Sequence, residues 1–195
     1  MQPNRLPLRP IAYVALFAAI FVVLSTVTIP VGLTPVPITL QTLALLLAGT
    51  MIGGGYAFLS IAVVIALTAL GFPLLRGAGG FSVLVGYTGG FLWLFPFAAY
   101  AAGWFASRIK GTGLLATVQL SLALIVSSAL VYAGGIPWYA HVADISLAKA
   151  FTLACLPFLP GDLIKVGAAV LITLTVRKLN LVPQLSAKDR IVPLD

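Results

Sequence analysis

Long apolar runs alternate along the chain with short segments rich in glycine, proline and polar residues. The runs cover Ile11–Ile29, Ile38–Ile52, Tyr56–Leu70, Phe91–Ser107, Leu114–Ala133 and Gly161–Val176. A membrane-spanning helix needs about 20 apolar residues, so the second and third runs are short, and only the glycine turn Met51–Gly55 separates them. The pattern predicts an all-α integral membrane protein with six transmembrane helices. We expect one domain over residues 1–195, with about the last 10–15 residues as a flexible cytoplasmic tail.

The composition supports a membrane location. Of the 195 residues, 61% are hydrophobic and 8% are charged, which is more apolar surface than a water-soluble domain can bury. The sequence contains one cysteine, Cys155, so neither an intramolecular disulfide nor a metal site built on cysteines is available. We expect a buried free thiol, no metal and no cofactor.

The basic residues predict the orientation in the membrane. The formal net charge is +7, but the cations cluster at the ends of the apolar runs, which argues against a nucleic-acid surface. An even number of spans puts both termini on one side, and the positive-inside rule makes that side cytoplasmic in a multi-pass protein of the cell membrane. The cytoplasmic segments then hold Arg5, Arg9, Arg108, Lys110, Arg177, Lys178, Lys188 and Arg190, and the outer segments hold Arg76 and Lys149.

The outer connections carry most of the glycine, proline and polar residues. They are Pro30–Pro37, Gly71–Gly90 and Gly134–Pro160. Elaborate loops on one face predict that the recognition surface lies there. In the third connection we expect a short interfacial helix over Ile145–Leu156, with Trp138 and Tyr139 at the boundary between lipid and water. We interpret His141 as an ordinary interfacial residue.

An acid and a base lie at the outer start of the last span. Asp162 and Lys165 are three residues apart, so they share one face of a helix. Ionisable residues at this depth are costly, and such residues typically face a cavity and bind something. Gln41 lies at the same level in the second span. A structural ion pair at the helix end, and a Gln41 side chain bonded only to neighbouring helices, are the alternatives.

Three stretches together point to a family. They are Pro35–Gln41 (PVPITLQ) followed by Thr42, Gly71–Gly90 (GFPLLRGAGGFSVLVGYTGG) and Pro160–Lys165 (PGDLIK). In combination they resemble the biotin-specific substrate-binding subunits, the S components, of energy-coupling factor transporters, over nearly the whole chain. Such sequences commonly read GPTGGY where Gly86–Phe91 here reads GYTGGF. The resemblance implies a six-helix membrane fold that captures biotin from outside.

The chemistry of biotin fits the polar residues. Its ureido group has two N–H donors and a carbonyl acceptor, and an apolar tail ends in a carboxylate. Asp162 can accept from the N–H groups, Lys165 can donate to a carbonyl or a carboxylate, and Gln41 can do both. We therefore expect these three side chains to hold the polar ring. A ligand that lacked these groups would leave buried charges unpaired, at about 1–3 kcal/mol or more.

The second outer connection supplies further candidates. Gly79 and Gly80, together with Tyr87, are predicted to close over the ligand, because glycine lets the backbone approach closely. Ordinary turn formation explains the glycines equally well. Arg76 could attract or hold the ligand carboxylate, or it could simply be solvated at the interface. No GxxxxGK[ST] phosphate-binding loop occurs in the sequence.

Without this motif the chain has no visible means of hydrolysing ATP. Uphill transport then needs a partner that supplies energy, unless transport is passive or coupled to an ion. The family usually works with a transmembrane coupling protein and two ATP-binding cassette ATPases. Ala15 and Ala19 form a small-xxx-small pair in the first span, which the resemblance implies as the face for the coupling protein. Packing within the chain would explain the pair as well.

Two other functions remain open. The chain could be a carrier that works without the ATPases. It could also be an intramembrane enzyme that uses Asp162 with Lys165 or His141, but no pairing of nucleophile and base and no metal-ligand spacing accompanies these residues. We therefore expect a transport protein with no catalytic residues.

Overall fold

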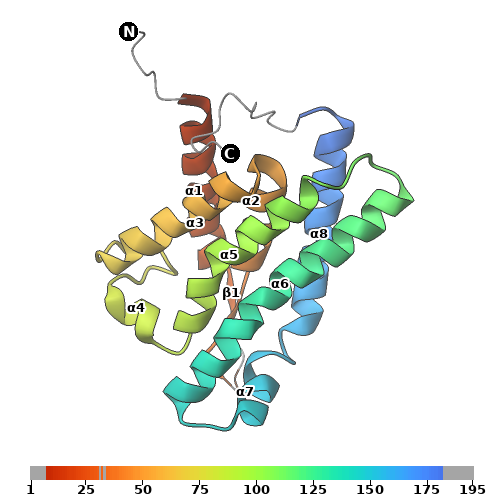
Figure 1. Cartoon of the computed structure of the whole chain (residues 1–195). Coiled ribbons are helices and arrows are strands. Elements are labelled where there is room, and N and C mark those ends of the chain that lie inside the picture. Colours follow the sequence, from red (N-terminus) through yellow and green to blue (C-terminus); the bar gives the residue numbers. More distant parts are fainter. Residues whose placement is uncertain (1–7, 31, 33, 182–195) are drawn as a thin grey trace, which may run out of the picture.

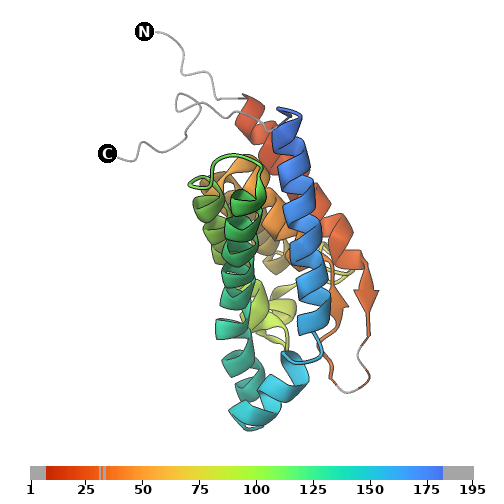
Figure 2. The same ribbon diagram turned by 90° about the vertical axis from the view of Figure 1, so that its right-hand side faces the viewer.

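The computed structural model describes residues 8–30, 32 and 34–181 (Figures 1 and 2). The predicted cytoplasmic tail, and with it Lys188 and Arg190, lies outside the described residues, as does Arg5. The helices are α1 (Leu8–Thr26), α2 (Gln41–Ile52), α3 (Gly54–Ala69), α4 (Phe81–Val85), α5 (Gly89–Ala106), α6 (Leu114–Ala143), α7 (Leu147–Ala154) and α8 (Leu159–Lys178). The strands β1 (Thr28–Ile29) and β2 (Ile38–Thr39) form an antiparallel pair.

The described helices confirm the all-α membrane class. Among them, α1, α5, α6 and α8 are long and apolar enough to cross a membrane. Helices α2 and α3 are also apolar, but they have only 12 and 16 residues. At about 1.5 Å per residue, α2 rises about 18 Å, well short of the ~30 Å hydrocarbon core. Each predicted span therefore corresponds to a helix, and two of these helices are too short to cross alone.

The second predicted span begins as a strand, and its expected helical start at Ile38 was wrong. Ile38 and Thr39 pair with β1, and the helix begins at Gln41. Ile38 and Thr39 are β-branched, and such residues suit a strand. The Thr39 hydroxyl then accepts a hydrogen bond from the Gln41 backbone N–H at 3.4 Å. The chain thus enters α2 from an extended segment.

Helix α6 runs ten residues past the predicted end at Ala133. It has 30 residues and contains Pro137, so the third outer connection is shorter than expected. Gly134 and Gly135, which suggested the end of the helix, allow close packing instead. A Cβ on Gly135 would lie 2.3 Å from the Phe91 ring of α5. A proline inside a membrane helix is tolerated where neighbouring groups satisfy the freed backbone.

The third connection contains the predicted interfacial helix in shorter form. Helix α7 occupies Leu147–Ala154, inside the expected Ile145–Leu156, and the Ser146 hydroxyl caps it by accepting from the Lys149 N–H at 3.3 Å. Trp138 and Tyr139 do not lie in a loop as predicted but within α6. Trp138 Nε1 donates to the Gly86 carbonyl at 2.9 Å, and Tyr139 is buried, so both contact the rest of the protein.

The connections divide between two ends of the molecule (Figures 1 and 2). The β1–β2 hairpin, α4 and α7 lie in the lower half of Figure 1. The start of α1, the α5–α6 connection and the end of α8 lie at the top, as an even number of crossings requires. The lower end is the one for which the sequence predicted a recognition surface.

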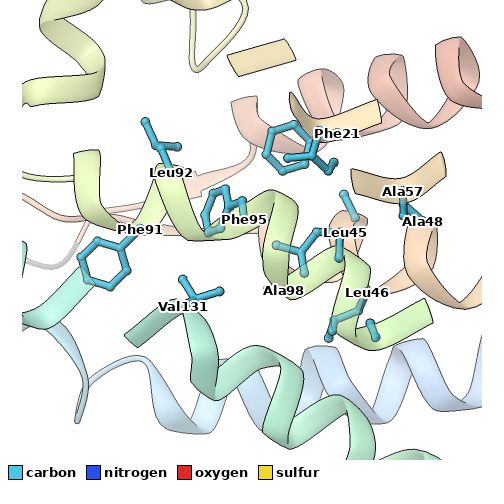
Figure 3. Packing of buried hydrophobic residues seen from close by; sticks show 14 of the residues in the cluster. Phe21, Leu45, Leu46, Ala48, Ala57, Phe91, Leu92, Phe95, Ala98 and Val131 are labelled. Atoms are coloured by element: carbon cyan, nitrogen blue, oxygen red, sulfur yellow. The ribbon is translucent and has the colours of Figure 1, made fainter. Parts of the chain in front are cut away.

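Helix α5 is the centre of the packing. It contacts α2, α3 and α6, and 61% of its residues are buried, against 17% in the apolar window of α1. Figure 3 shows Phe95 of α5 beside Phe21 of α1, and their rings meet edge to face at a centroid distance of 5.8 Å. Helix α1 therefore lies at the periphery, with most of its surface uncovered.

Glycines set the distance between α5 and the α2–α3 pair. A Cβ on Gly103 would lie 2.2 Å from the Gly54 backbone nitrogen, and a Cβ on Gly49 would lie 2.6 Å from the Ala99 carbonyl oxygen. Both neighbours are backbone atoms, which cannot move aside as a side chain can. In lipid, where apolar area alone gives little drive for association, such close contact is a principal source of helix packing.

We predict that Gly103→Ala destabilises the protein by about 1–3 kcal/mol, as overpacking does, and lowers its melting temperature in detergent. Gly167→Ala is the matched control, because a Cβ at Gly167 of α8 would meet nothing within 4 Å. The control should melt at or slightly above the parent temperature. Equal melting of the two variants would contradict the packing role of Gly103.

Candidate functional site

A pocket opens among the elements at the lower end of Figure 1. Its walls come from the segment before α2, the start of α2, the α3–α4 connection, α4, the first half of α5, the middle of α6 and the start of α8. The empty volume is about 650 Å³, including the open mouth. Segments far apart in the sequence thus meet around one cavity.

A buried cluster of three polar side chains lies in this pocket. Lys165 Nζ donates to Asp162 Oδ1 at 2.8 Å, and the Tyr132 hydroxyl donates to Asp162 Oδ2. Asp162 is 8% exposed and Lys165 is 6% exposed. Asp162 also lies in the first turn of α8, where the helix dipole favours a carboxylate. The predicted acid–base pair on one helix face is present and faces the pocket.

Sequence reasoning missed Tyr132. It comes from α6 and lines the pocket, and its ring meets Phe91 edge to face at a centroid distance of 6.1 Å. A signal was available, because Tyr132 is the only aromatic residue of the predicted span Leu114–Ala133. A buried tyrosine hydroxyl usually has a hydrogen-bond partner, so a tyrosine inside a span suggests a nearby polar group.

Gln41 lines the pocket and has an unsatisfied donor. Its Oε1 accepts a hydrogen bond from the Thr39 hydroxyl at 3.1 Å, but its buried Nε2 has no partner among the described residues. Gln41 is 5% exposed, so water reaches it little. An unpaired buried donor costs about 1–3 kcal/mol, and a ligand acceptor would remove that penalty. The ligand role of Gln41 stays a prediction, and so does its alternative of bonding only to neighbouring helices.

The rest of the lining is mostly apolar. It includes three phenylalanines, from α5 and from the residue that precedes α8, together with aliphatic side chains from five elements. The apolar lining comprises Val36, Leu75, Val83, Phe91, Leu92, Phe95, Val131 and Phe158. A few polar groups on one side and apolar walls elsewhere suit a ligand with a compact polar head and an apolar body.

Arg76 lines the pocket from the α3–α4 connection. Its backbone is left-handed, with a φ of 56°, and its N–H donates to the Ser25 hydroxyl of α1 at 3.1 Å. The residue is largely exposed, yet partial burial of the guanidinium lowers the pKa of Arg76 from its usual value. Arginine stays protonated under such a shift, so Arg76 adds a positive charge to the lining.

Other predicted residues are not among the described residues that line the pocket. Gly79 packs on backbone, since a Cβ there would lie 2.5 Å from the Phe72 carbonyl oxygen, and Gly80 has a φ of 96°. Tyr87 is 45% exposed and meets the Tyr139 ring edge to face at a centroid distance of 6.0 Å. Closure of these residues over a ligand stays a prediction.

Residues predicted for other roles lie elsewhere in the fold. Ala15 and Ala19 are exposed on α1. His141 is exposed near the end of α6. Cys155 is a buried free thiol, as expected, and burial first and the charge of Asp162 second raise the pKa of this thiol.

Comparison with known proteins gives consistent matches along the chain. Residues 1–181 match the model of the BioY family. The biotin transporter BioY of Rhizobium etli is 37% identical over 170 residues, which cover 84% of this chain and 90% of that relative. The biotin transporter BioY of Thermotoga maritima is 34% identical over 182 residues, which cover 89% of this chain and 98% of that relative.

A solved structure matches the fold. It is the crystal structure of the S-component for biotin from an ECF-type ABC transporter, with a TM-score of 0.82 and 28% identity. The match covers 91% of this chain and 95% of that one. The overall helical arrangement is therefore similar in both proteins.

We predict that Asp162 and Lys165 are strongly coupled in the unliganded protein. Lys165→Met leaves a buried carboxylate without its cation and should reduce stability by about 3–5 kcal/mol. Adding Asp162→Asn removes the unpaired charge, so the double variant should be much less destabilised than the sum of the single variants. Unfolding by heat or denaturant in detergent measures this coupling when the parent, both single variants and the double variant are compared.

A control cycle uses Asp144→Asn and Lys149→Met, an acid and a base that form no ion pair in the described structure. Their effects should add within about 0.5 kcal/mol. Additive effects for Asp162 and Lys165 as well would contradict the coupling.

Proposed function

Because the chain belongs to the BioY family, we propose that it binds biotin in this pocket from the outer side of the membrane and delivers it inward as a transport subunit. The observation that carries the proposal is the joint presence of a buried acid, base and hydroxyl with an unpaired amide donor, in a pocket that is otherwise mainly apolar. The family and its curated relatives are transporters rather than enzymes.

The polar side chains match the ureido ring. Asp162 accepts from the ureido N–H groups, while Lys165 and the free Gln41 amide N–H donate to its carbonyl. The phenylalanine walls hold the thioether ring and the start of the tail. A ligand of similar size without the ureido group would leave the same groups buried and unpaired, which gives selectivity.

The outer loop closes the site in this proposal. Gly79 and Gly80 shape the turn beside Arg76, and Tyr87 joins the aromatic contact with Tyr139. These residues act by positioning the loop over the bound ring. The neighbouring Thr88, which lines the pocket, supports a role for this segment.

We also propose that the termini are cytoplasmic. Cations near the end of the molecule that holds the start of α1 outnumber those near the pocket, which favours that end as the inner side. Among the described residues the first group comprises Arg9, Arg108, Lys110, Arg177 and Lys178, and the second comprises Arg76 and Lys149 together with Lys165 within the last span. The pocket then faces outward.

Energy comes from partners in this proposal. The sequence has no ATP-binding loop, and the solved structure that the chain resembles is described as part of an ECF-type ABC transporter. A transmembrane coupling protein and two ABC ATPases would supply the energy. Ala15 and Ala19 support a docking face on α1, because both are exposed and small side chains let another helix approach closely.

We predict that Asp162→Asn weakens biotin binding by at least about tenfold, because it removes a charge-assisted acceptor and leaves Lys165 without its counter-charge. Isothermal calorimetry on the purified protein in detergent measures the affinity. Asp144→Asn is the matched control, since Asp144 is exposed at the end of α6 and asparagine tolerates its left-handed backbone. Equal affinity in the Asp162 variant and the parent would remove the proposed site.

We predict that tryptophan at both Ala15 and Ala19 abolishes assembly with the coupling protein and leaves biotin affinity within about twofold, because the changed face lies outside the pocket lining. Co-purification from cells that express all components measures the assembly. Ala129→Trp, at an exposed alanine of α6, is the control and should assemble normally. Normal assembly of the α1 variant would show that another face binds the partner.

A further inference from the structure

The charges that line the pocket do not balance. Asp162 and Lys165 form an ion pair at 2.8 Å and neutralise each other. Arg76 also lines the pocket, and its guanidinium has no ion pair and no side-chain hydrogen bond with the residues that the structure describes. The described lining therefore has a net charge of about +1, carried by Arg76.

The turn that carries Arg76 is well defined. Leu75 and Ala78 exchange two backbone hydrogen bonds, with N–O distances of 3.2 and 2.9 Å. Leu75 is 1% exposed and anchors the turn in the core. The Ser25 hydroxyl accepts from the Arg76 N–H and itself donates to the Val22 carbonyl at 2.6 Å, which ties the turn to α1.

The backbone at Arg76 is unfavourable for an arginine. A non-glycine residue with positive φ is uncommon, and glycine would relieve the strain at this position. Gly77 follows with a φ of 72°, so the turn continues in the left-handed region. The surrounding contacts thus hold Arg76 in a backbone conformation that is unfavourable for a residue with a side chain. Its long cationic side chain lies next to the cavity.

We infer, on the basis of the proposed function, that Arg76 is the counter-ion of the ligand carboxylate. The bound ligand then lies with its ureido ring against Asp162 and Gln41 and with its tail carboxylate at Arg76. The opposite orientation would place a carboxylate beside that of Asp162, where like charges repel, while Lys165 is already paired. The site thereby selects a monoanion over a neutral ligand of the same shape.

Burial supports this orientation. The Asp162–Lys165 pair is almost inaccessible, whereas Arg76 is largely exposed at the edge of the lining. A neutral ureido group can enter the buried part without desolvating a charge, and the carboxylate can keep some water at the mouth. The neutral end of the ligand then lies in the buried part of the pocket, and its charged end lies at the exposed cation.

The test compares Arg76→Gln with the parent protein, using biotin and uncharged biotinamide in calorimetry at low ionic strength. Glutamine keeps the Cβ and part of the stem, so the backbone strain at this position changes little. The parent should bind biotin more tightly than biotinamide. The variant should bind biotin about five- to twentyfold more weakly, as expected for a partly exposed charge-assisted contact, and should bind biotinamide as the parent does.

Two further variants sharpen the test. Arg76→Lys keeps the charge and should recover part of the affinity for biotin. Lys149→Gln removes a cation that is exposed in α7, away from the pocket lining, and should bind biotin as the parent does. Equal weakening in the Lys149 and Arg76 variants would indicate a general field effect and overturn the inference.

The outcomes separate this inference from the proposed function. If the folded parent binds neither ligand, the proposed function fails. If the parent binds biotin and Arg76→Gln binds biotin equally well, or weakens for biotin and biotinamide to the same extent, the carboxylate contact is wrong and the biotin site remains.

Discussion

Everything in this molecule depends on the requirement that polar groups in hydrocarbon find partners inside the protein. The second span shows the consequence most clearly. It enters as strand β2 and becomes helical at Gln41, and the β1–β2 pairing satisfies part of the extended backbone. Non-helical backbone at membrane depth is tolerated where protein buries it or where it borders a cavity. Here Pro37 and Thr39 border the pocket, so the break in the span and the site occur together.

The same requirement explains the cluster on α8. A carboxylate near hydrocarbon is tolerable only with a full set of partners, and Asp162 has Lys165 on one oxygen and Tyr132 on the other. The two partners come from different helices, so the cluster also ties α6 to α8. Gln41 is the exception, because its Nε2 lacks a partner within the described structure. Asp162 is thus fully partnered, whereas Gln41, which lines the same pocket, keeps one unsatisfied donor.

Close helix contact makes the geometry possible. Gly90 of α5 and Gly135 of α6 bring the two helices together, and a Cβ on either would overlap the opposite helix. This contact carries Tyr132 of α6 toward α8 and places Phe91 on the pocket wall. Phe91, the last residue of the segment GYTGGF, places its ring in the lining.

The sequence by itself determined the membrane class, the approximate positions of the spans and the facing pair Asp162 and Lys165, because hydropathy and helical spacing are local properties. It placed the start of the second helix and the end of α6 wrongly, since Ile38 pairs with Ile29 of β1 and Gly135 packs against Phe91 of α5, contacts that hydropathy and helical spacing do not show. Only the tertiary structure brought Tyr132 to Asp162 and left the Gln41 amide unpaired. It also placed Arg76 at the cavity and Gly79 outside the described lining. These features depend on contacts between helices, and packing geometry, which local sequence does not encode, sets those contacts.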